Sequence, residues 1–217
     1  ACVSRACPVP AGPGPAAARP SSACVIDMPL SLWLLPAEPA RAALMERMAA
    51  LGTQLGTPVG GAPHVTLIGN VGDSSDRKSV SEKLERLRGT GPVLLRFSSV
   101  AAGVFPAGHE LAGQSPWSQT AAAIVETCPE LERLKRLSDQ AFSSPPASAD
   151  AGVSVEWAPP LGLPHLSLAY GSDPRVSSEL EAPVQCEADA VAIFDCTPAS
   201  LAGIPGWAEV ARVSLRD

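Results

Sequence analysis

The chain has 217 residues, of which 46% are hydrophobic, so it can form one sizeable core but is short for two independent domains. Its formal net charge is −6 at pH 7 and it has no run of lysines and arginines, which argues against a long nucleic acid as partner. A small phosphorylated ligand remains compatible with this charge. No apolar segment approaches the ~20 residues that a membrane-spanning helix needs, so we expect no membrane association.

The first 27 residues differ in composition from the rest of the chain. They are rich in alanine, proline and glycine and contain no acidic residue before Asp27. Such a segment cannot bury enough apolar surface to order itself, so we predict a disordered leader. It is compatible with an organelle transit peptide and with a non-native extension ahead of Met28. We therefore expect one folded domain over residues 28–217, in the cytoplasm or, with a transit peptide, in a plastid.

Strands and helices alternate through the first half of the folded part. Hydrophobic periodicity predicts a strand at 30–35, a helix over 38–55 that Gly56 closes, a strand at 64–69, an amphipathic helix over 74–88 and one long or two short strands over 92–105. Residues 106–118 contain many glycines and prolines and predict a loop.

The second half repeats this order. The pattern predicts a strand at 120–127, a helix over 127–142 with Thr127 as N-cap, a long loop over 143–162, a strand at 165–170, a short helix around 174–182 and closing strands at 189–195 and 207–215. The repetition indicates a weak internal duplication. Mixed strands and helices in this order favour an α+β class with two sheets related by an approximate two-fold.

Two of the three histidines lie in nearly the same frame, "PHVTL" for His64 and "PHLSL" for His165. Side chains two residues apart on a strand share a face, so Thr66 accompanies His64 and Ser167 accompanies His165. The aliphatic residues between them face a core. If the two halves of the chain face each other, two imidazoles and two hydroxyls meet in one cleft.

This set of side chains suits the opening of a phosphodiester ring without a metal or another cofactor. One histidine can accept a proton from water, the other can donate one to the departing alkoxide, and the hydroxyls can hold the non-bridging oxygens. Either motif alone is weak evidence; the pair in a duplicated pattern is stronger. A two-histidine metal site is the chemical rival, although the nearby acids and cysteines lack ligand spacing. His109 has no such frame and is expected on the surface.

The paired motifs, together with "LWLLP", "WSQTAAAIVET", "PELERL" and the full "PHLSLAY", resemble the two-histidine (2H) phosphoesterase superfamily over roughly residues 29–215. Within it the chain looks most like the plant-type cyclic phosphodiesterases. The resemblance implies a bilobal α+β fold, with two antiparallel sheets and outer helices related by a pseudo-two-fold axis around a central groove. It also implies metal-independent hydrolysis of ADP-ribose 1″,2″-cyclic phosphate and of nucleoside 2′,3′-cyclic phosphates, the latter to 2′-phosphates, as by-products of RNA and tRNA processing.

Carried over residue by residue, the resemblance makes His64 and His165 catalytic and makes Thr66 and Ser167 phosphate-binding. It assigns the base that activates water to His165 and the acid to His64, in a site that is nearly symmetric.

Three further residues are candidates for the groove. By resemblance, Tyr170 lines the region of the base or ribose and Trp33 stacks on the nucleobase, with plain packing as the alternative for both. Gln119 is placed on a central strand from which it can reach the groove. We expect the six cysteines to be reduced thiols, with Cys186 and Cys196 as the one candidate disulfide pair.

Two other functions stay open on the sequence. A 2′,5′-RNA ligase-like or other oligonucleotide phosphoesterase would handle longer RNA, and we would expect basic flanks around its groove. A non-catalytic nucleotide-binding module usually loses one of the motif side chains, and all four are present. We expect a small cyclic-phosphate nucleotide as partner, no long nucleic acid, no membrane and a monomer.

Overall fold

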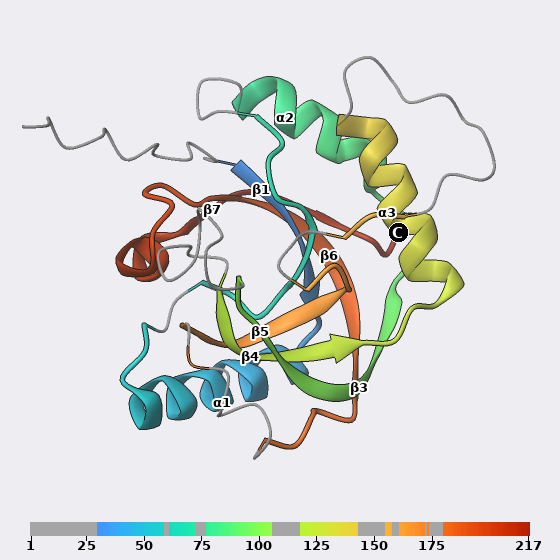
Figure 1. Cartoon of the computed structure of the whole chain (residues 1–217). Helices are drawn as coiled ribbons and strands as arrows, with labels where there is room; N and C mark the ends of the chain where they lie inside the picture. Colours follow the sequence, from blue (N-terminus) through green and yellow to red (C-terminus); the bar gives the residue numbers. More distant parts are fainter. Residues whose placement is uncertain are drawn as a thin grey trace, which may run out of the picture.

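The computed structural model describes residues 30–58, 61–72, 77–105, 118–142, 155–157, 161–171, 173 and 180–217. In this part of the chain, seven strands form one antiparallel sheet with helices outside it (Figure 1). The strands are β1 (Leu30–Pro36), β2 (Val65–Ile68), β3 (Val93–Gly103), β4 (Gln119–Val125), β5 (His165–Tyr170), β6 (Gln185–Asp195) and β7 (Ala208–Ser214). The helices are α1 (Ala40–Leu55), α2 (Arg77–Leu84) and α3 (Pro129–Phe142), with the 3-10 helices η2 (Glu85–Leu87) and η4 (Leu201–Gly206).

The strand order shows the predicted internal duplication. The sheet runs β1-β2-β5-β4-β3-β6-β7, and β1 also pairs with β6, so the first six strands close into a ring. β1, α1, β2 and β3 of the first half correspond to β4, α3, β5 and β6 of the second, and the two halves meet where β2 pairs with β5. This confirms the predicted α+β class. The prediction of two separate sheets is wrong, however, because hydrogen bonds between β2 and β5, β1 and β6, and β3 and β6 join the halves into one continuous sheet.

Most predicted elements are present with small shifts at their ends. α1 ends at Gly56, whose φ of 62° is the left-handed conformation that glycine adopts at low cost. α3 begins later than predicted: its first backbone hydrogen bond runs from the Glu132 N–H to the Cys128 carbonyl, so Cys128 and not Thr127 is the N-cap. Pro129 at the first helical position explains this start, because it has no N–H to satisfy. The helix predicted around 174–182 and the loop predicted at 106–118 lie almost entirely outside the described residues, and only parts of the 143–162 loop are described.

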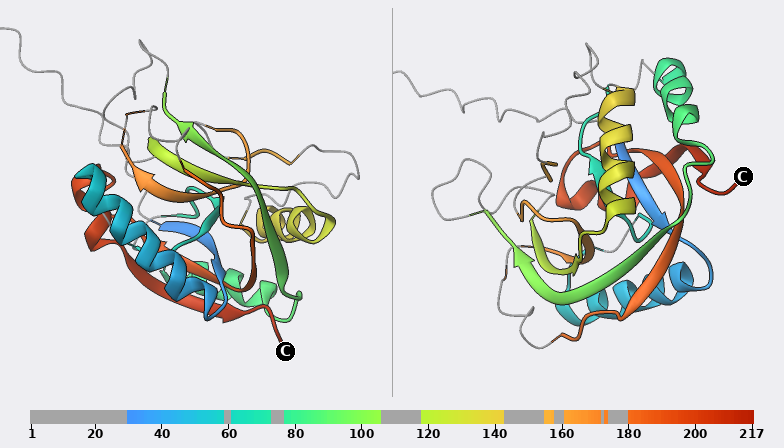
Figure 2. Two further views of the ribbon diagram at one scale, coloured as in Figure 1. Left: turned by 90° about the horizontal axis from the view of Figure 1, so that it is seen from below. Right: turned by 90° about the vertical axis from the view of Figure 1, so that its right-hand side faces the viewer.

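Side chains of the strands alternate between two hydrophobic clusters on opposite faces of the sheet. The helix-side core packs the strands against α1, α2 and α3, which cover one face with α2 and α3 next to each other (Figures 1 and 2). It includes Leu30, Leu32, Leu34, Leu44, Leu51, Val65, Leu67, Val80, Leu84, Leu131, Leu134, Leu166 and Leu168. The site-side cluster lies on the other face and consists of Trp33, Leu35, Ala62, Tyr170, Ala190, Ala192, Phe194, Cys196, Ile204 and Trp207.

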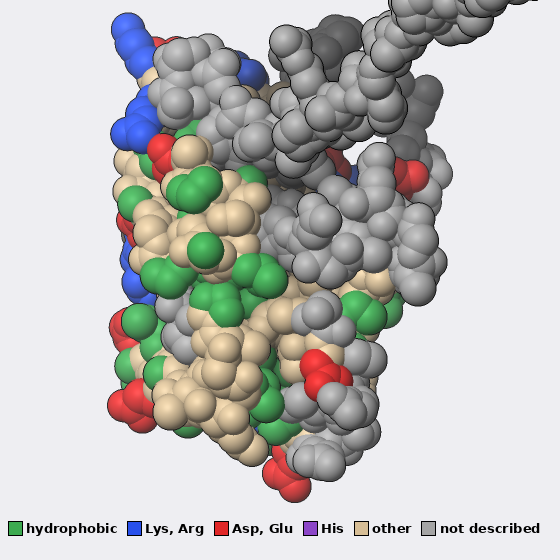
Figure 3. Space-filling model, turned by 60° about the vertical axis from the view of Figure 1, so that its left-hand side comes forward, with side chains coloured by type: hydrophobic (Ala, Val, Ile, Leu, Met, Phe, Trp, Pro, Cys, Tyr) green, Lys and Arg blue, Asp and Glu red, His purple; other side chains and the backbone are tan. Residues whose placement is uncertain are grey.

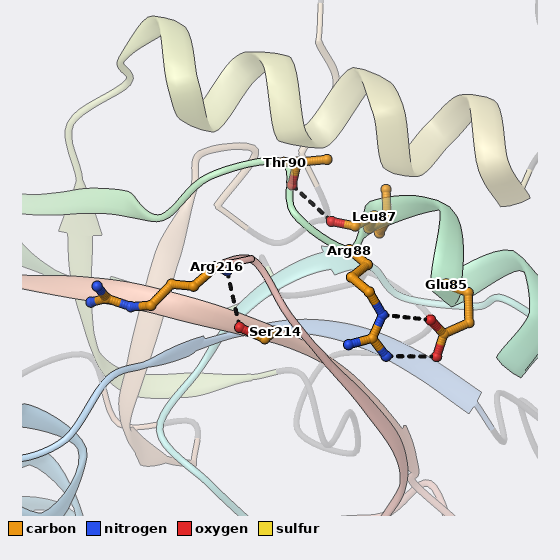
Figure 4. A network of polar contacts seen from close by, with 6 residues as sticks. All are labelled: Glu85, Leu87, Arg88, Thr90, Ser214 and Arg216. Atoms are coloured by element: carbon orange, nitrogen blue, oxygen red, sulfur yellow. Dashed lines mark hydrogen bonds and ion pairs between the residues drawn. The ribbon is translucent and has the colours of Figure 1, made fainter.

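The turn after α2 is tied to the end of β7. Arg88 donates two hydrogen bonds to the carboxylate of Glu85, at 2.8 and 3.0 Å, and the Thr90 hydroxyl donates to the Leu87 carbonyl at 2.9 Å (Figure 4). Backbone N–H groups of Gly89 and Gly91 then donate to carbonyls of the last strand and of the residue after it. These contacts hold the turn against the end of β7, which pairs with β6 along its length.

The three described cysteines, Cys128, Cys186 and Cys196, are free thiols, so the candidate pair is not bridged. Within the described residues, no helix is both long and apolar enough to cross a membrane. On the face seen in Figure 3, hydrophobic side chains are scattered between polar ones, and no histidine side chain is visible among the coloured atoms. His64 and His165 are only 4% and 7% exposed.

Candidate functional site

The two histidine motifs lie on adjacent antiparallel strands. Val65 of β2 pairs with Leu166 of β5, and both side chains point into the helix-side core. Extending this register by one residue each way sets His64 opposite Ser167 and Thr66 opposite His165, on the other face of the sheet. The structure thus brings the four predicted side chains together, with each imidazole across from the hydroxyl of the other motif.

Both imidazoles are anchored in the same way. Nδ1 of His64 lies 2.7 Å from the carbonyl oxygen of Ala62, and Nδ1 of His165 lies 2.7 Å from that of Leu163. A carbonyl oxygen can only accept, so Nδ1 of each ring carries the hydrogen and Nε2 of the neutral ring has a free electron pair. The residue between carbonyl and histidine is a proline in both motifs, and its fixed φ helps to set this geometry. The repeated Pro-His sequence therefore places both rings so that the neutral imidazole carries its hydrogen on Nδ1.

Burial keeps both histidines neutral in the free protein. It lowers the pKa of His64 from 6.5 to about 3, against the opposing effect of the Ala62 carbonyl, and positive charge on His165 lowers it further. Burial also lowers the pKa of His165, with the Leu163 carbonyl acting in the opposite direction.

Trp33 forms a flat wall beside the first motif. It pairs with Thr66 across β1 and β2, and its ring stacks on that of His64 with centroids 3.5 Å apart and planes 1° apart. Phe194 covers the opposite face at a centroid distance of 3.9 Å, and the indole N–H donates to the Ser31 hydroxyl at 2.8 Å. Because both ring faces are covered by protein, this geometry favours support of His64 over the predicted stacking on a nucleobase.

Tyr170 reaches the same face because the strands are irregular. It lies three residues after Ser167, which in a regular strand would place it on the opposite face. However, β5 has one extra residue at Leu168 and β4 has one at Thr120, as the register between the two strands shows. The Tyr170 ring therefore joins the site-side cluster, 3% exposed and edge-on to Trp207.

The Tyr170 hydroxyl is hydrogen-bonded to Ser167. Burial raises the pKa of the Tyr170 phenol, and the hydrogen bond with Ser167 lowers it in part. The phenol is therefore neutral across the range in which the histidines titrate. Its contact with Ser167 links the predicted substrate-binding tyrosine directly to a predicted phosphate-binding hydroxyl.

Gln119 contacts the second motif, as its position on the central strand predicts. Its amide nitrogen lies 2.9 Å from Nε2 of His165, and the side chain is 5% exposed. The sequence did not indicate Phe194 or Ser31, which hold Trp33 from β6 and from β1; no local motif marks them. His109 lies outside the described residues. Over the described ranges, no group of three or more histidines, cysteines and acids has the geometry of a metal site.

Comparisons with known proteins give a likeness of structure only. No protein-family model and no curated protein sequence matches the chain. Among solved structures, E. coli LigT complexed with NADP+ is similar over 88% of this chain and 99% of that one, at 13% identity and a TM-score of 0.50. The protein TT0787 of Thermus thermophilus is 20% identical over 87% of this chain and 98% of its own, with a TM-score of 0.49. A protein described as a phosphoesterase is 13% identical over 88% and 99%, with a TM-score of 0.49.

The fold is that of the 2H phosphoesterases. This conclusion comes from the likeness of architecture and agrees with the duplicated strand order, in which the two histidine strands meet at the centre. At these identities the likeness shows the fold alone.

Proposed function

We propose that this protein is a metal-independent cyclic phosphodiesterase that opens nucleoside 2′,3′-cyclic phosphates and ADP-ribose 1″,2″-cyclic phosphate. One observation carries the proposal: two imidazoles on adjacent strands, both fixed in the Nδ1–H tautomer, each lie across from a hydroxyl residue. Two proton-transferring groups and two hydrogen-bond donors on one rigid face match the needs of ring opening at phosphorus.

The proposed step uses Nε2 of both histidines. Nε2 of neutral His165 takes a proton from water while the water oxygen bonds to phosphorus. One ester P–O bond of the ring breaks, and the imidazolium of His64 gives its Nε2 proton to the departing alkoxide. For a 2′,3′-cyclic phosphate the P–O3′ bond breaks and the product is the 2′-phosphate. Solvent then returns a proton to His64 and removes one from His165.

The bound phosphate supplies what His64 lacks in the free protein. With a pKa of about 3, this imidazole is neutral when the site is empty. A phosphodiester anion beside it favours the charged form and raises that pKa. The acid would therefore be charged chiefly when substrate is present, which suits a group that acts only in the complex.

The remaining side chains act on the two phosphate oxygens and on the catalytic rings. The Thr66 and Ser167 hydroxyls would donate to the non-bridging oxygens, where negative charge grows in the transition state. Tyr170 would act through Ser167 by fixing the direction of its hydroxyl. Trp33 would act through His64 by fixing its ring plane.

The test is hydrolysis of 2′,3′-cyclic AMP and of ADP-ribose 1″,2″-cyclic phosphate in the presence of EDTA. We expect turnover by the wild type and a loss of at least ~10² in His64→Ala and His165→Ala, the scale of one acid–base group. The third histidine provides the matched control, so His109→Ala should keep full activity. Full activity of either motif variant would refute the two-histidine mechanism, and loss of activity in EDTA would point to a metal.

The same assay separates the two alternatives that the sequence leaves open. A 2′,5′-linked oligoadenylate added as a substrate tests for an oligonucleotide phosphoesterase. Binding of 2′,3′-cyclic AMP without turnover by the wild type would indicate a nucleotide-binding module instead.

A further inference from the structure

The Gln119 amide is buried against His165 with only one of its two ends paired. Its nitrogen is 2.9 Å from Nε2 of His165, whereas its oxygen Oε1 is buried without a hydrogen-bond partner. A buried amide oxygen without a partner is uncommon in folded proteins. The unpaired oxygen of Gln119 lies beside a ring that is proposed to transfer protons, so a role in that transfer would explain it.

The Leu163 carbonyl sets the direction of the Gln119 contact. Because Nδ1 of His165 carries the hydrogen, Nε2 of the neutral ring must accept, and the Gln119 amide nitrogen donates to it. Nε2 has a single electron pair, so the amide nitrogen must leave it before Nε2 can take a proton from water. The protonated Nε2 is a donor, and the amide nitrogen can no longer face it. Rotation of the amide by about 180° brings Oε1 to the same place as an acceptor. The unpaired oxygen is then the partner of the protonated ring.

We propose that Gln119 is a positioning residue that holds the His165 ring in one orientation before and after proton transfer, and that its amide leaves the single Nε2 electron pair to the water while that water is deprotonated. Gln119 would donate from its amide nitrogen to neutral His165 and accept with Oε1 from the imidazolium. This inference rests on the proposed function, because a ring that exchanges a proton in each turnover is the reason for needing a two-way partner.

The difference between the two halves of the molecule explains why only the second motif needs this partner. Trp33 pairs with Thr66 beside the first histidine, and the corresponding position beside the second motif, opposite Ser167, is Ala122. A methyl group cannot provide the flat wall that the indole gives His64. Gln119, which enters from the start of β4, fixes His165 by hydrogen bonding instead.

Within the described part of the chain, the strands next to His165 contribute few other ionisable groups. β5 contributes Tyr170, β2 contributes His64, and β4 pairs Ile124 and Ala122 with the motif. Burial and the Leu163 carbonyl are the influences on the His165 pKa. A carboxylate introduced at position 119 would therefore act on His165 without a strong competitor.

The experiment measures the ring ¹⁵N shifts of His165 by NMR as a function of pH, in the free protein and without any substrate. Gln119→Glu places a carboxylate at Nε2 and should raise the pKa of His165 by at least about one unit, since an opposite charge at this distance favours the imidazolium. Thr120→Val, a buried neighbour on the same strand, is the matched control and should leave it unchanged. An unaltered His165 pKa in Gln119→Glu would overturn the contact.

The positioning role is tested with Gln119→Met, which keeps the length of the side chain and removes both hydrogen-bonding ends. With its thermal midpoint checked against the wild type, it should lower kcat at least about fivefold and leave KM within about twofold, as expected when a base is misoriented but binding is intact. Wild-type kcat in Gln119→Met would overturn the role. If the wild type hydrolyses no cyclic phosphate, the proposed function fails, while the NMR measurement still decides the contact.

Discussion

The indole of Trp33 lies parallel to the imidazole of His64, with ring centroids 3.5 Å apart and planes 1° apart. Phe194 from β6 packs on the other face of the indole, and the Ser31 hydroxyl accepts from its N–H. The orientation of a proposed catalytic ring is thus set by residues from both ends of the described chain. The Ala62 carbonyl fixes one edge of the imidazole, and the indole fixes its plane.

Replacement of Trp33 should therefore lower kcat and leave KM nearly unchanged. Trp33→Phe keeps an aromatic face against His64 and loses the hydrogen bond to Ser31, so we expect less than about a fivefold loss of kcat. Trp33→Leu removes the flat wall and should lower kcat at least about tenfold, because small displacements of a catalytic ring are costly. Steady-state kinetics with 2′,3′-cyclic AMP measures both values.

The stability of the Trp33 variants must be followed in parallel. Trp33 is fully buried, so Trp33→Leu also removes packing and should lower the free energy of unfolding by about 2–4 kcal/mol. Kinetics is therefore measured well below the thermal midpoint of the variant. If instead Trp33 stacks on the nucleobase, Trp33→Leu will raise KM for nucleotides and spare kcat.

The low pKa values of both histidines predict an acidic optimum for kcat/KM. The productive free protein carries one proton on the pair, and both pKa values lie below 6.5, that of His64 at about 3. As pH rises above the higher pKa, the singly protonated form falls about tenfold per unit, and kcat/KM should follow it. The peak should therefore lie below pH 6.5. A profile that is flat from pH 6.5 to 8.5 would contradict this assignment.

The same shift predicts how stability depends on pH. The pKa of His64 is depressed in the folded state, so the unfolded chain binds one more proton below pH 6.5. Its contribution to stability is present above pH 6.5 and is lost as pH falls toward the folded value of about 3. The slope for one group is about 1.4 kcal/mol per pH unit.

Urea unfolding of the wild type and of His64→Gln between pH 5 and 6.5 measures this contribution. As pH falls through this interval, the free energy of unfolding should fall more steeply in the wild type. The difference in slope should approach that of one titrating group, about 1.4 kcal/mol per pH unit. Carboxylates common to both proteins cancel in the comparison. Equal slopes would show that His64 is not buried as a neutral group.

The sequence predicts the parts of the site that depend on local patterns. Period-two alternation places His64 with Thr66 and His165 with Ser167, and the repeated Pro-His frame relates the two motifs. Both signals lie within a few residues, so no partner strand is needed to detect them. The pairing of β2 with β5 is not among these predictions, because the duplicated order of elements suggests two separate sheets and not one continuous sheet.

The parts that the sequence does not predict depend on contacts between distant segments. Tyr170 lies on the site face only because of extra residues at Leu168 and Thr120, and such irregularities are defined by the pairing of two strands. The environment of Trp33 depends on Phe194, which comes near the end of the chain. A period-two pattern contains neither kind of information.

Removal of the Tyr170 hydroxyl tests the link between this residue and Ser167. Tyr170→Phe keeps the ring packed against Trp207 and loses the hydrogen bond, so we expect a drop of about three- to tenfold in kcat/KM with little change in stability. In a Ser167→Ala background the same change should have almost no further effect, because the partner is already absent. Additive losses in the double variant would indicate that Tyr170 contacts the substrate directly.

Gly171 follows Tyr170 and closes β5 against β4, so a side chain there should disturb the site from its edge. Its φ is 138°, and a Cβ would lie 2.7 Å from the Thr120 hydroxyl oxygen. Gly171→Ala should therefore lower the free energy of unfolding by about 1–3 kcal/mol. Gly206→Ala, where a Cβ meets nothing within 4 Å, is the control and should change it by less than about 0.5 kcal/mol. Chemical denaturation measures both.

Adding Thr120→Ala to Gly171→Ala removes the clash but not the backbone strain, so the double variant should recover part of the lost free energy of unfolding. No recovery would show that the contact with Thr120 is unimportant.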